Sequence, residues 1–366
     1  MLSLFESFPE LQKNLPHIPL GDFPTPIQTM DSLAKTIGMD SLYIKYDSLS
    51  GTPYGGNKLR KLEFLIGDAL HKRSQGIITF GCAGSNHALA TAIYAKQNGL
   101  KCTSLLFPQP NALMVQKNLL ASFHFGAELH YCISEKMMKN ILERQIKKHE
   151  SSFGCTPVII PPGGSSPLGT VGYVNAGFEL KQQVSAGLIP EPDFIYLASG
   201  TMGTSAGLQL GVMAAGLKTK VVPIRVTDVK YSSESGMSQL FNETCTLLRE
   251  YDETFPSLHL PETETGLRHD FFGTEYARYT RESVEAVKLM KETEQIMLER
   301  TYTGKALAAL IHDANLGLLK DKVVVFLNTY NSRGLDDVPA ELDYHNLPGD
   351  FHRYFEEDVQ ELDREQ

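Results

Sequence analysis

Short apolar runs alternate along this chain with amphipathic segments, and glycine-containing turns separate them. The run at 77–80 predicts a buried strand, and the Gly81–Gly84 turn ends it. Ser85 then predicts a helix N-cap, with apolar residues at helical spacing over 89–96. Gly99 fits a C-cap, and 102–107 predicts the next strand. This order is that of one strand–helix–strand unit with parallel strands and a right-handed crossover.

The same pattern recurs further along the chain. Residues 194–198 predict a strand, 199–204 a glycine-containing turn and 205–216 a helix. The remaining predicted elements are a strand at 221–226, an amphipathic helix at 282–296 and a continuously apolar, central strand at 323–327. Alternation of this kind predicts an α/β fold with a parallel sheet.

Length and charge narrow the possible functions. The 366 residues are long for one compact core and fit two packed lobes. A formal net charge of −9 argues against nucleic-acid binding, which needs a basic face. No apolar run is long enough to cross a bilayer, and the start of the chain lacks the basic and apolar regions of a secretion signal. We therefore expect a soluble, cytoplasmic protein without nucleic-acid or membrane partners.

The five cysteines are Cys82, Cys102, Cys132, Cys155 and Cys245. Their number is odd, and no two stand at metal-ligand spacing. A disulfide framework is not expected in so long a chain with an ordinary apolar content. We expect most of them to be small buried thiols, and we expect no metal site. Cys82 is excepted from the expectation of burial, because it precedes a turn with polar side chains.

A lysine follows a pair of glycines in Gly55-Gly56-Asn57-Lys58. Asn57 is a favourable N-cap, so Lys58 is expected in the first turn of a helix. A cation there is disfavoured by the helix dipole, and this lowers the pKa of a lysine. A neutral lysine amine can bond covalently to a carbonyl compound. The alternative is a solvated lysine on a surface helix.

Two strand-to-helix turns have the composition of anion sites. In Gly81–Ala88, backbone N–H groups at the helix start are joined by the side chains of Ser85 and Asn86. In Ala198–Gly207, glycines and hydroxyls can surround a phosphate. Neither turn carries a nucleotide fingerprint, so a dehydrogenase has little support. A third glycine- and hydroxyl-rich stretch, Pro161–Tyr173, predicts a long loop, for which an interdomain connection is as good an interpretation as a functional one.

Taken together, these motifs resemble the pyridoxal-phosphate (PLP) enzymes of fold type II, in the branch of 1-aminocyclopropane-1-carboxylate deaminase and D-cysteine desulfhydrase. The resemblance covers about residues 21–329, and the motifs occur in the family's order: GGNKLRKLEFL, GSNHA, GGSSPLGTVGY, SGTMGTSAG and YTGKA. It implies a two-lobed, open parallel-sheet fold of the tryptophan synthase beta type. It also implies a homodimer that acts on a small amino acid.

The resemblance assigns roles to particular residues. Lys58 carries PLP and takes the α-proton as general base. The phosphate is held by the turn that consists of Ser199, Gly200, Thr201, Met202, Gly203 and Thr204. Ser85 and Asn86 contact substrate and cofactor, and the amides of Ser85, Asn86 and His87 receive the substrate carboxylate. Tyr302 is an active-site residue, and a second tyrosine of the family matches Tyr276, for which Tyr279 is a rival. Either Tyr276 or Tyr302 would assist the leaving group, and the hydroxyl of Thr329, or that of Thr303, approaches the cofactor ring.

Departures from the family pattern bear on the reaction. Deaminases that open the cyclopropane ring carry Glu after the tyrosine of this motif, where this chain has Thr303. The chain has Asn328-Thr329-Tyr330-Asn331 where desulfhydrases usually have HTGG, and Met202 replaces a usual glycine. A hydroxyl at the ring nitrogen makes a weaker electron sink than a carboxylate would, which favours the loss of a β-leaving group.

We therefore expect α,β-elimination or deamination, similar to that of D-cysteine desulfhydrase, which gives a 2-oxo acid and ammonia. The alternatives on the same cofactor are an amino-acid racemase and a cyclopropane amino-acid deaminase. A non-catalytic small-molecule binding protein is the alternative of another class.

The expected domains are a large PLP-binding domain of residues 1–60 plus 171–345 and a small α/β domain of 61–170. An acidic C-terminal tail of 346–366 should follow them. Near the end of the chain, acidic residues are frequent, among them Asp336, Asp337, Glu341 and Glu365. The aromatic residues Tyr344, Phe351, Tyr354 and Phe355 suggest that part of this region packs on the body of the protein. We expect the acidic end itself to be solvated.

Overall fold

A computed structural model describes residues 1–335, 338–339 and 342–364 of the chain. Asp336, Asp337, Glu341 and Glu365, four residues of the predicted acidic region, lie outside the described residues. The chain divides into two compact units. Unit 1 contains Met1–Leu15, Gly21–Lys61 and Ser165–Arg333, and unit 2 contains Pro16–Leu20, Leu62–Gly164 and the described residues from Gly334 on.

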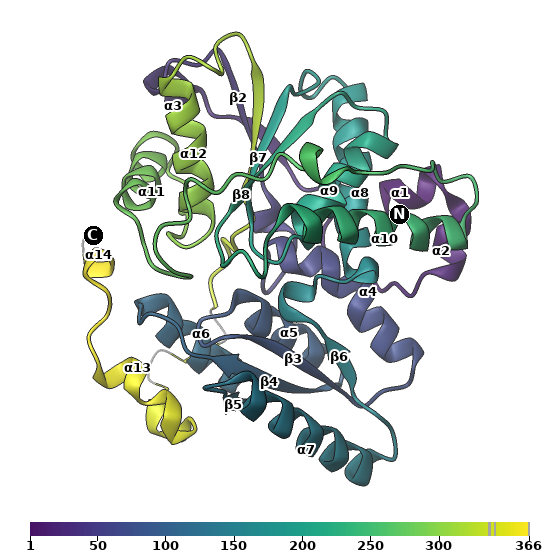
Figure 1. Cartoon of the computed structure of the whole chain (residues 1–366), viewed down its shortest axis with the longest axis vertical. Helices are drawn as coiled ribbons and strands as arrows, with labels where there is room; N and C mark the ends of the chain where they lie inside the picture. Colours follow the sequence, from purple (N-terminus) through teal and green to yellow (C-terminus); the bar gives the residue numbers. More distant parts are fainter. Residues whose placement is uncertain (336–337, 340–341, 365–366) are drawn as a thin grey trace. The chain divides into compact units, whose positions relative to one another are not determined.

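Unit 1 is built on a five-stranded sheet in the order β1-β2-β9-β7-β8 (Figure 1). Strand β1 is antiparallel to β2, and all other neighbours are parallel. The strands are β1 (Ile27–Thr29), β2 (Ser41–Lys45), β7 (Phe194–Ser199), β8 (Lys220–Arg225) and β9 (Val323–Leu327). The helices are α1 (Ser3–Ser7), α2 (Pro9–Asn14), α3 (Asp31–Thr36), α8 (Pro167–Ser185), α9 (Gly203–Ala214), α10 (Glu234–Tyr251), α11 (Arg281–Glu294) and α12 (Thr303–Asn315).

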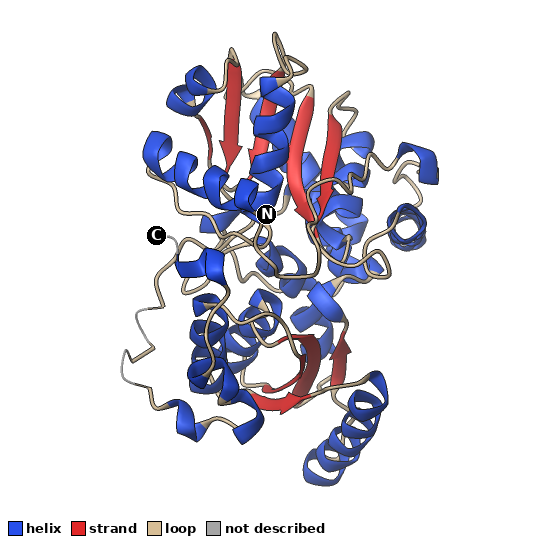
Figure 2. Ribbon diagram, turned by 60° about the vertical axis from the view of Figure 1, so that its left-hand side comes forward, coloured by secondary structure: helices blue, strands red, loops and turns tan. Residues whose placement is uncertain are grey.

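Helices cover both faces of this sheet (Figure 2). Successive residues of a strand point to opposite faces, so a strand that is buried on both sides is apolar throughout. In β9, Val324 and Phe326 join the core beneath α3, α11 and α12, whereas Val325 and Leu327 join the core beneath α8 and α9. The continuous apolar run that predicted a central strand is thereby explained.

Unit 2 contains a smaller, fully parallel sheet in the order β5-β4-β3-β6. Helix α4 (Asn57–His71) begins in unit 1 and continues in unit 2. The strands are β3 (Gly76–Cys82), β4 (Lys101–Phe107), β5 (Glu128–Tyr131) and β6 (Val158–Ile160). The helices are α5 (Asn86–Gln97), α6 (Leu113–His124), α7 (Glu135–Phe153), α13 (Arg353–Glu356) and α14 (Glu361–Arg364).

The fold class and the regular elements agree with the sequence-based predictions, whereas two local interpretations were wrong. The stretch up to Tyr173 is not one long loop, because α8 starts at Pro167 with Ser166 as its N-cap. The expectation of a solvated acidic end holds for Glu356, Glu357, Asp358 and Glu361, which are exposed, but was wrong for Asp363, which is buried. The expected packing of aromatic residues is confirmed by Phe351 and Tyr354, which are buried within unit 2. The C-terminal residues group with unit 2, whereas we had expected residues up to 345 in the larger domain.

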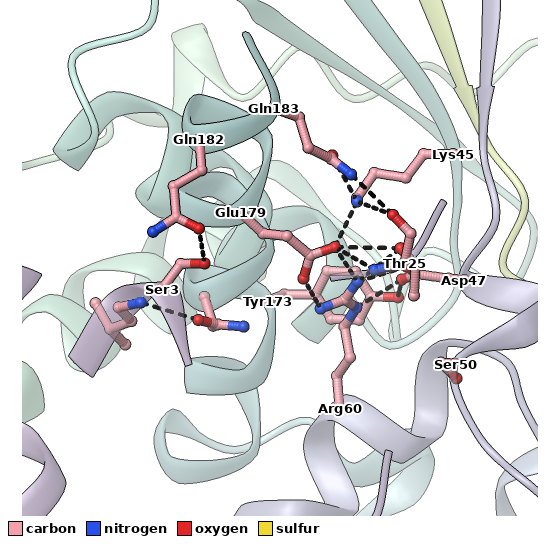
Figure 3. A network of polar contacts seen from close by, with 12 residues as sticks. Ser3, Thr25, Lys45, Asp47, Ser50, Arg60, Tyr173, Glu179, Gln182 and Gln183 are labelled. Carbon is pink, nitrogen blue, oxygen red and sulfur yellow. Dashed lines mark hydrogen bonds and ion pairs between the residues drawn. The ribbon is translucent and has the colours of Figure 1, made fainter. Parts of the chain in front are cut away.

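Five buried polar side chains of unit 1 form a network next to the start of α4 (Figure 3). Arg60 donates to Asp47 Oδ1 at 2.7 Å and to Glu179 Oε2 at 2.8 Å. Lys45 Nζ lies 2.5 Å from Glu179 Oε1, and Tyr173 Oη donates to Asp47 Oδ2 at 2.5 Å. Two cations thus face two carboxylates in the interior of the unit. Burial alone would raise the pKa of Glu179, but Arg60 and Lys45 reverse this and lower it to about 2.

We expect Lys45→Met to lower the free energy of unfolding by about 3–5 kcal/mol, because it leaves Glu179 buried with one counter-charge fewer. The matched control is Lys72→Met, whose ion pair with Asp68 is exposed and should contribute less than ~1 kcal/mol. Urea unfolding of both variants tests this. Equal losses would contradict a structural role of the network.

Candidate functional site

Three loops of unit 1 meet at one edge of its sheet. Strands β2, β9 and β7 are parallel neighbours, so their carboxyl ends lie along the same edge. The chain after β2 leads to Lys58, Thr329 follows β9, and the 199–204 turn follows β7. Ligands of open α/β sheets bind at the carboxyl ends of the strands. The topology therefore brings three sequence-predicted features to one place.

Hydrogen bonds confirm that these three loops are adjacent. The amide of Asn57 donates to the carbonyl of Thr329 at 3.0 Å, and Asn57 Nδ2 donates to Thr204 Oγ1 at 3.0 Å. Helix α4 begins at Asn57 itself rather than after it. Asn57 thus links the loop after β9 to the 199–204 turn. Its interpretation as an N-cap did not include this role. Lys58, the next residue, is held beside both.

Lys58 is half-buried in the first turn of α4. Burial lowers the pKa of its amine from 10.5 to about 8. The sequence had suggested that the helix dipole lowers the pKa of Lys58, whereas in the structure desolvation of its amine lowers it. An amine with this pKa is neutral in a substantial fraction of molecules near neutral pH, as covalent bonding to a carbonyl requires.

The backbone of the 199–204 turn allows other groups to approach it closely. Met202 adopts a left-handed conformation, with φ 64°, as the N-cap of α9. A methyl group on Gly203 would lie 2.6 Å from Ser165 Oγ and 2.7 Å from Lys61 Nζ, so a side chain there would displace these two groups. The amide of Gly203 donates to Ser165 Oγ at 3.1 Å, and that hydroxyl lies 2.7 Å from Thr201 Oγ1.

Lys61 is a site residue that the sequence analysis missed. Its side chain is buried, and its Nζ donates to Ser165 Oγ at 3.2 Å. Burial, and secondly the charge of Lys58, lower its pKa well below the usual value. Its position three residues after Lys58 was the available signal, since residues at this spacing share a helix face. An amine, hydroxyls and a helix N-terminus around Gly203 are donors suited to a phosphate group, whose negative charge would favour the protonated form of Lys61.

Two tyrosines pair beside the same turn. The hydroxyls of Tyr276 and Tyr302 are hydrogen-bonded to each other. The Tyr302 ring lies next to Gly200, since a methyl group there would be 3.7 Å from Tyr302 Cε1. The rival residue, Tyr279, is buried, with the Arg300 guanidinium 5.6 Å from its ring centre. This geometry favours Tyr276 over Tyr279 as the partner of Tyr302.

Helix α12 organises the surroundings of Tyr302. The Glu299 carboxylate accepts the amides of Thr301, Tyr302 and Thr303 and lies 3.0 Å from Thr303 Oγ1. The Thr303 hydroxyl is therefore engaged in a helix cap. Lys305 Nζ donates to the carbonyl of Phe272 at 2.5 Å, and so ties α12 to the segment that carries Tyr276. Neither Glu299 nor Lys305 was recognised from the sequence.

The second predicted anion site lies in unit 2. As predicted, Ser85 is the N-cap of α5, and its Oγ accepts the amide of Ala88 at 3.1 Å. The amide of Ser85 donates to Cys82 within the turn, and the buried ring of His87 contacts Thr79 Oγ1 at 3.0 Å. Asn86 Oδ1 accepts from Asn118 Nδ2 at 2.9 Å. The hydroxyl and the amide of Ser85, which were predicted to contact the substrate, are therefore both engaged within this turn.

All five cysteines are free thiols in the structure. Among the described residues, no helix combines the length and the apolar character needed to cross a membrane.

Comparison with known proteins identifies the family. Residues 18–329 match the model of the family described as pyridoxal-phosphate dependent enzyme. A Pyrococcus horikoshii protein named "Putative 1-aminocyclopropane-1-carboxylate deaminase" is 34% identical over 320 residues, which cover 87% of this chain and 93% of the relative. A Pyrococcus abyssi protein with the same name is 33% identical over 89% of this chain and 94% of its own length.

Solved structures agree with this result. The crystal structure of an ACC deaminase homologue matches with a TM-score of 0.76 and 31% identity, over 91% of this chain and 96% of the other. Serine racemase from Dictyostelium discoideum shares the fold at a TM-score of 0.60 and 18% identity, over 91% of this chain and 97% of its own. With the lysine, the glycine-lined turn and the tyrosine pair at one sheet edge, these matches show that this chain belongs to the pyridoxal-phosphate dependent enzymes.

Proposed function

We propose that this PLP-dependent enzyme catalyses α,β-elimination or deamination of a small amino acid, in which Lys58 bonds the cofactor. Pyridoxal phosphate is the cofactor of the family. The observation that carries the proposal is the juxtaposition of a half-buried amine of lowered pKa with the glycine-lined turn at the carboxyl edge of the unit 1 sheet. PLP supplies an electron sink for the carbanion at the substrate Cα.

The phosphate would be held by the turn of Ser199, Gly200, Thr201, Met202, Gly203 and Thr204. Lys61 Nζ lies close to Gly203, and a phosphate bound there would favour its protonated form. Ser165 contributes a hydroxyl that already contacts Thr201 and the amide of Gly203. A charge-assisted contact to phosphate is stronger than a neutral one, so Lys61 should matter for cofactor affinity more than any single hydroxyl of the turn.

Two groups of unit 1 are suited to move protons. Lys58 Nζ, when it is not bonded to the cofactor, accepts the proton from Cα, for which a pKa of about 8 is well matched to neutral pH. The Tyr276–Tyr302 pair can donate a proton to the group that leaves Cβ. The Cα–H and Cβ–X bonds then break, and hydrolysis of the enamine product gives a 2-oxo acid and ammonia.

The substrate carboxylate is assigned to the start of α5 in unit 2. Ser85 caps this helix, and the N-terminus of a helix favours a bound anion. Ser85 and Asn86 would also contact the cofactor and substrate through their side chains. Thr329 is assigned to the cofactor ring, because its carbonyl already binds the amide of Asn57 next to Lys58.

Elimination similar to that of D-cysteine desulfhydrase is preferred because a threonine follows Tyr302, and Glu299 engages its hydroxyl. No carboxylate side chain stands at position 303 to strengthen the electron sink. Opening of a cyclopropane amino acid is the second candidate, and the names of the two Pyrococcus relatives favour it. We also propose a homodimer, on the family resemblance, and a cytoplasmic location.

A substrate panel tests the proposed reaction. We expect release of 2-oxo acid and ammonia from cysteine, serine or chloroalanine in one enantiomeric series, because each has a leaving group at Cβ. Coupled assays of both enantiomers, together with 1-aminocyclopropane-1-carboxylate, measure this. Turnover of the cyclopropane compound alone would favour the second candidate, and interconversion of enantiomers without ammonia would favour a racemase.

Lys58→Ala should lower kcat at least about 10²–10⁴-fold, because it removes both the covalent attachment and the base. In the wild-type protein, borohydride reduction should leave a phosphopyridoxyl group on the peptide that contains Lys58, as mass mapping would show. The matched control is Lys72→Ala, a solvent-exposed lysine just beyond the same helix. Label on Lys61 instead of Lys58, or full turnover by the Lys58 variant, would refute the assignment.

The pH dependence of Lys58 reactivity follows from its pKa of about 8. Only a neutral amine reacts with an acylating reagent, so labelling of Lys58 in the cofactor-free protein should rise with pH and level off above about pH 9. Labelling of a reference amine, Nα-acetyl-lysine amide added to the same sample, should continue to rise toward about pH 10.4, the ordinary lysine value. Mass analysis of the Lys58 peptide and of the reference amine gives both profiles from one sample. Parallel profiles would show that burial does not lower the pKa of Lys58.

A further inference from the structure

The C-terminal segment Leu347–Asp363 lies beyond the part of the chain that matches the family model, which ends at residue 329. It nevertheless packs closely within unit 2 (Figure 1). Leu347, Phe351 and Tyr354 are almost fully buried, and the Phe351 ring contacts the Tyr131 ring edge to face at 5.3 Å. So much apolar burial is not expected of a passive tail.

The segment binds the loop that follows β4. Tyr354 Oη accepts the amide of Gln109 at 3.1 Å. Asn111 Nδ2 donates to the carbonyls of Tyr354 and Glu357, at 3.1 and 2.9 Å, and the carbonyl of Asn111 accepts the amide of Gln360 at 3.0 Å. The loop is therefore held by both its backbone and its side chains.

The segment also supplies the cap that α6 lacks. The N-cap position of α6 is Ala112, which has no side-chain acceptor. Asp363 Oδ2 accepts the amide of Leu113, in the first turn of α6, at 2.7 Å. A carboxylate at this end also interacts favourably with the helix dipole. Asp363 is remote in sequence, so local pattern alone does not reveal this cap.

The same loop and helix hold the turn that precedes α5. Gln109 Oε1 accepts the amide of Gly84 at 2.9 Å. Asn118, in α6, donates from Nδ2 to the carbonyl of Gly84 and to Asn86 Oδ1, both at 2.9 Å. Tyr354 is thus connected to Gly84 through one residue, Gln109, and Asp363 to Gly84 and Asn86 through α6.

We propose that the segment Leu347–Asp363 positions the Gly84–Asn86 turn, with Tyr354 and Asp363 as positioning residues, and thereby sets the affinity for the amino-acid substrate. Only the effect on substrate affinity rests on the proposed function, in which this turn receives the substrate carboxylate. The geometric part concerns hydrogen bonds within unit 2 and can be tested without any substrate.

Tyr354→Phe removes the acceptor of the Gln109 amide but keeps the buried ring. We expect amide hydrogen exchange at Gly84 to become about 3- to 10-fold faster, because its acceptor, Gln109, is no longer fixed by the segment. KM should rise by a similar factor, with kcat changed less. The matched control is Tyr344→Phe. It removes a tyrosine hydroxyl from the same part of the chain but keeps the ring that contacts Phe355 and the neighbouring histidines.

A second pair of variants separates positioning from a general loss of stability. Asp363→Ala should also speed exchange at Gly84, whereas Asp363→Asn keeps an oxygen acceptor for the Leu113 amide and should restore most of the protection. Thermal unfolding of each variant verifies that it is folded in the assay. The exchange data are interpreted only at temperatures where all four variants are native.

Unchanged exchange at Gly84 in both Tyr354→Phe and Asp363→Ala would overturn the proposal, as would an equal effect of Tyr344→Phe. Faster exchange with an unchanged KM would overturn the link to substrate affinity. If the wild-type protein turns over no amino acid at all, the proposed function fails, and hydrogen exchange alone then decides whether the segment positions the turn.

Discussion

The buried contact between Arg60 and the carboxylates of Asp47 and Glu179 is the constraint from which the candidate site follows. Arg60 lies in the first turns of α4, between Lys58 and Lys61. Its backbone also lies so close to α8 that a methyl group on Gly172 would be 2.0 Å from the Arg60 carbonyl oxygen. Charge pairing and backbone contact together fix the rotation of α4. Breaking a buried ion pair is costly, so the helix has little freedom to turn its two lysines elsewhere.

Once α4 is fixed, electrostatics distinguish its two lysines. Both amines are desolvated, and the charge of Lys58 further disfavours a charge on Lys61. Lys61 is buried against Ser165 and Gly203, where the charge of a bound anion would stabilise the protonated form of its amine. Lys58 is half-buried, and desolvation rather than a neighbouring charge lowers the pKa of its amine. One lysine therefore suits a phosphate, and its neighbour suits covalent chemistry.

The sequence predicted those parts of the fold and site that depend on local pattern. The strand–turn–helix signals around Ser85 and Ser199 are local, and the structure places N-caps at Ser85 and at Met202. Lys61, Glu299 and Lys305 were missed because their roles depend on contacts with residues remote in sequence or with backbone amides. The role of Asp363 was missed for the same reason. The acidic composition of the C-terminal segment suggested solvation, whereas Asp363 caps a helix about 250 residues earlier in the chain.

A crystal structure of the protein with pyridoxal phosphate bound would test the roles of Lys58 and Lys61 together. We expect continuous electron density between the cofactor and Lys58 Nζ. We also expect the phosphate to lie against the 199–204 turn and within hydrogen-bond distance of Lys61 Nζ. A covalent bond to Lys61, or a phosphate bound away from Gly203, would contradict the division of roles between the two lysines.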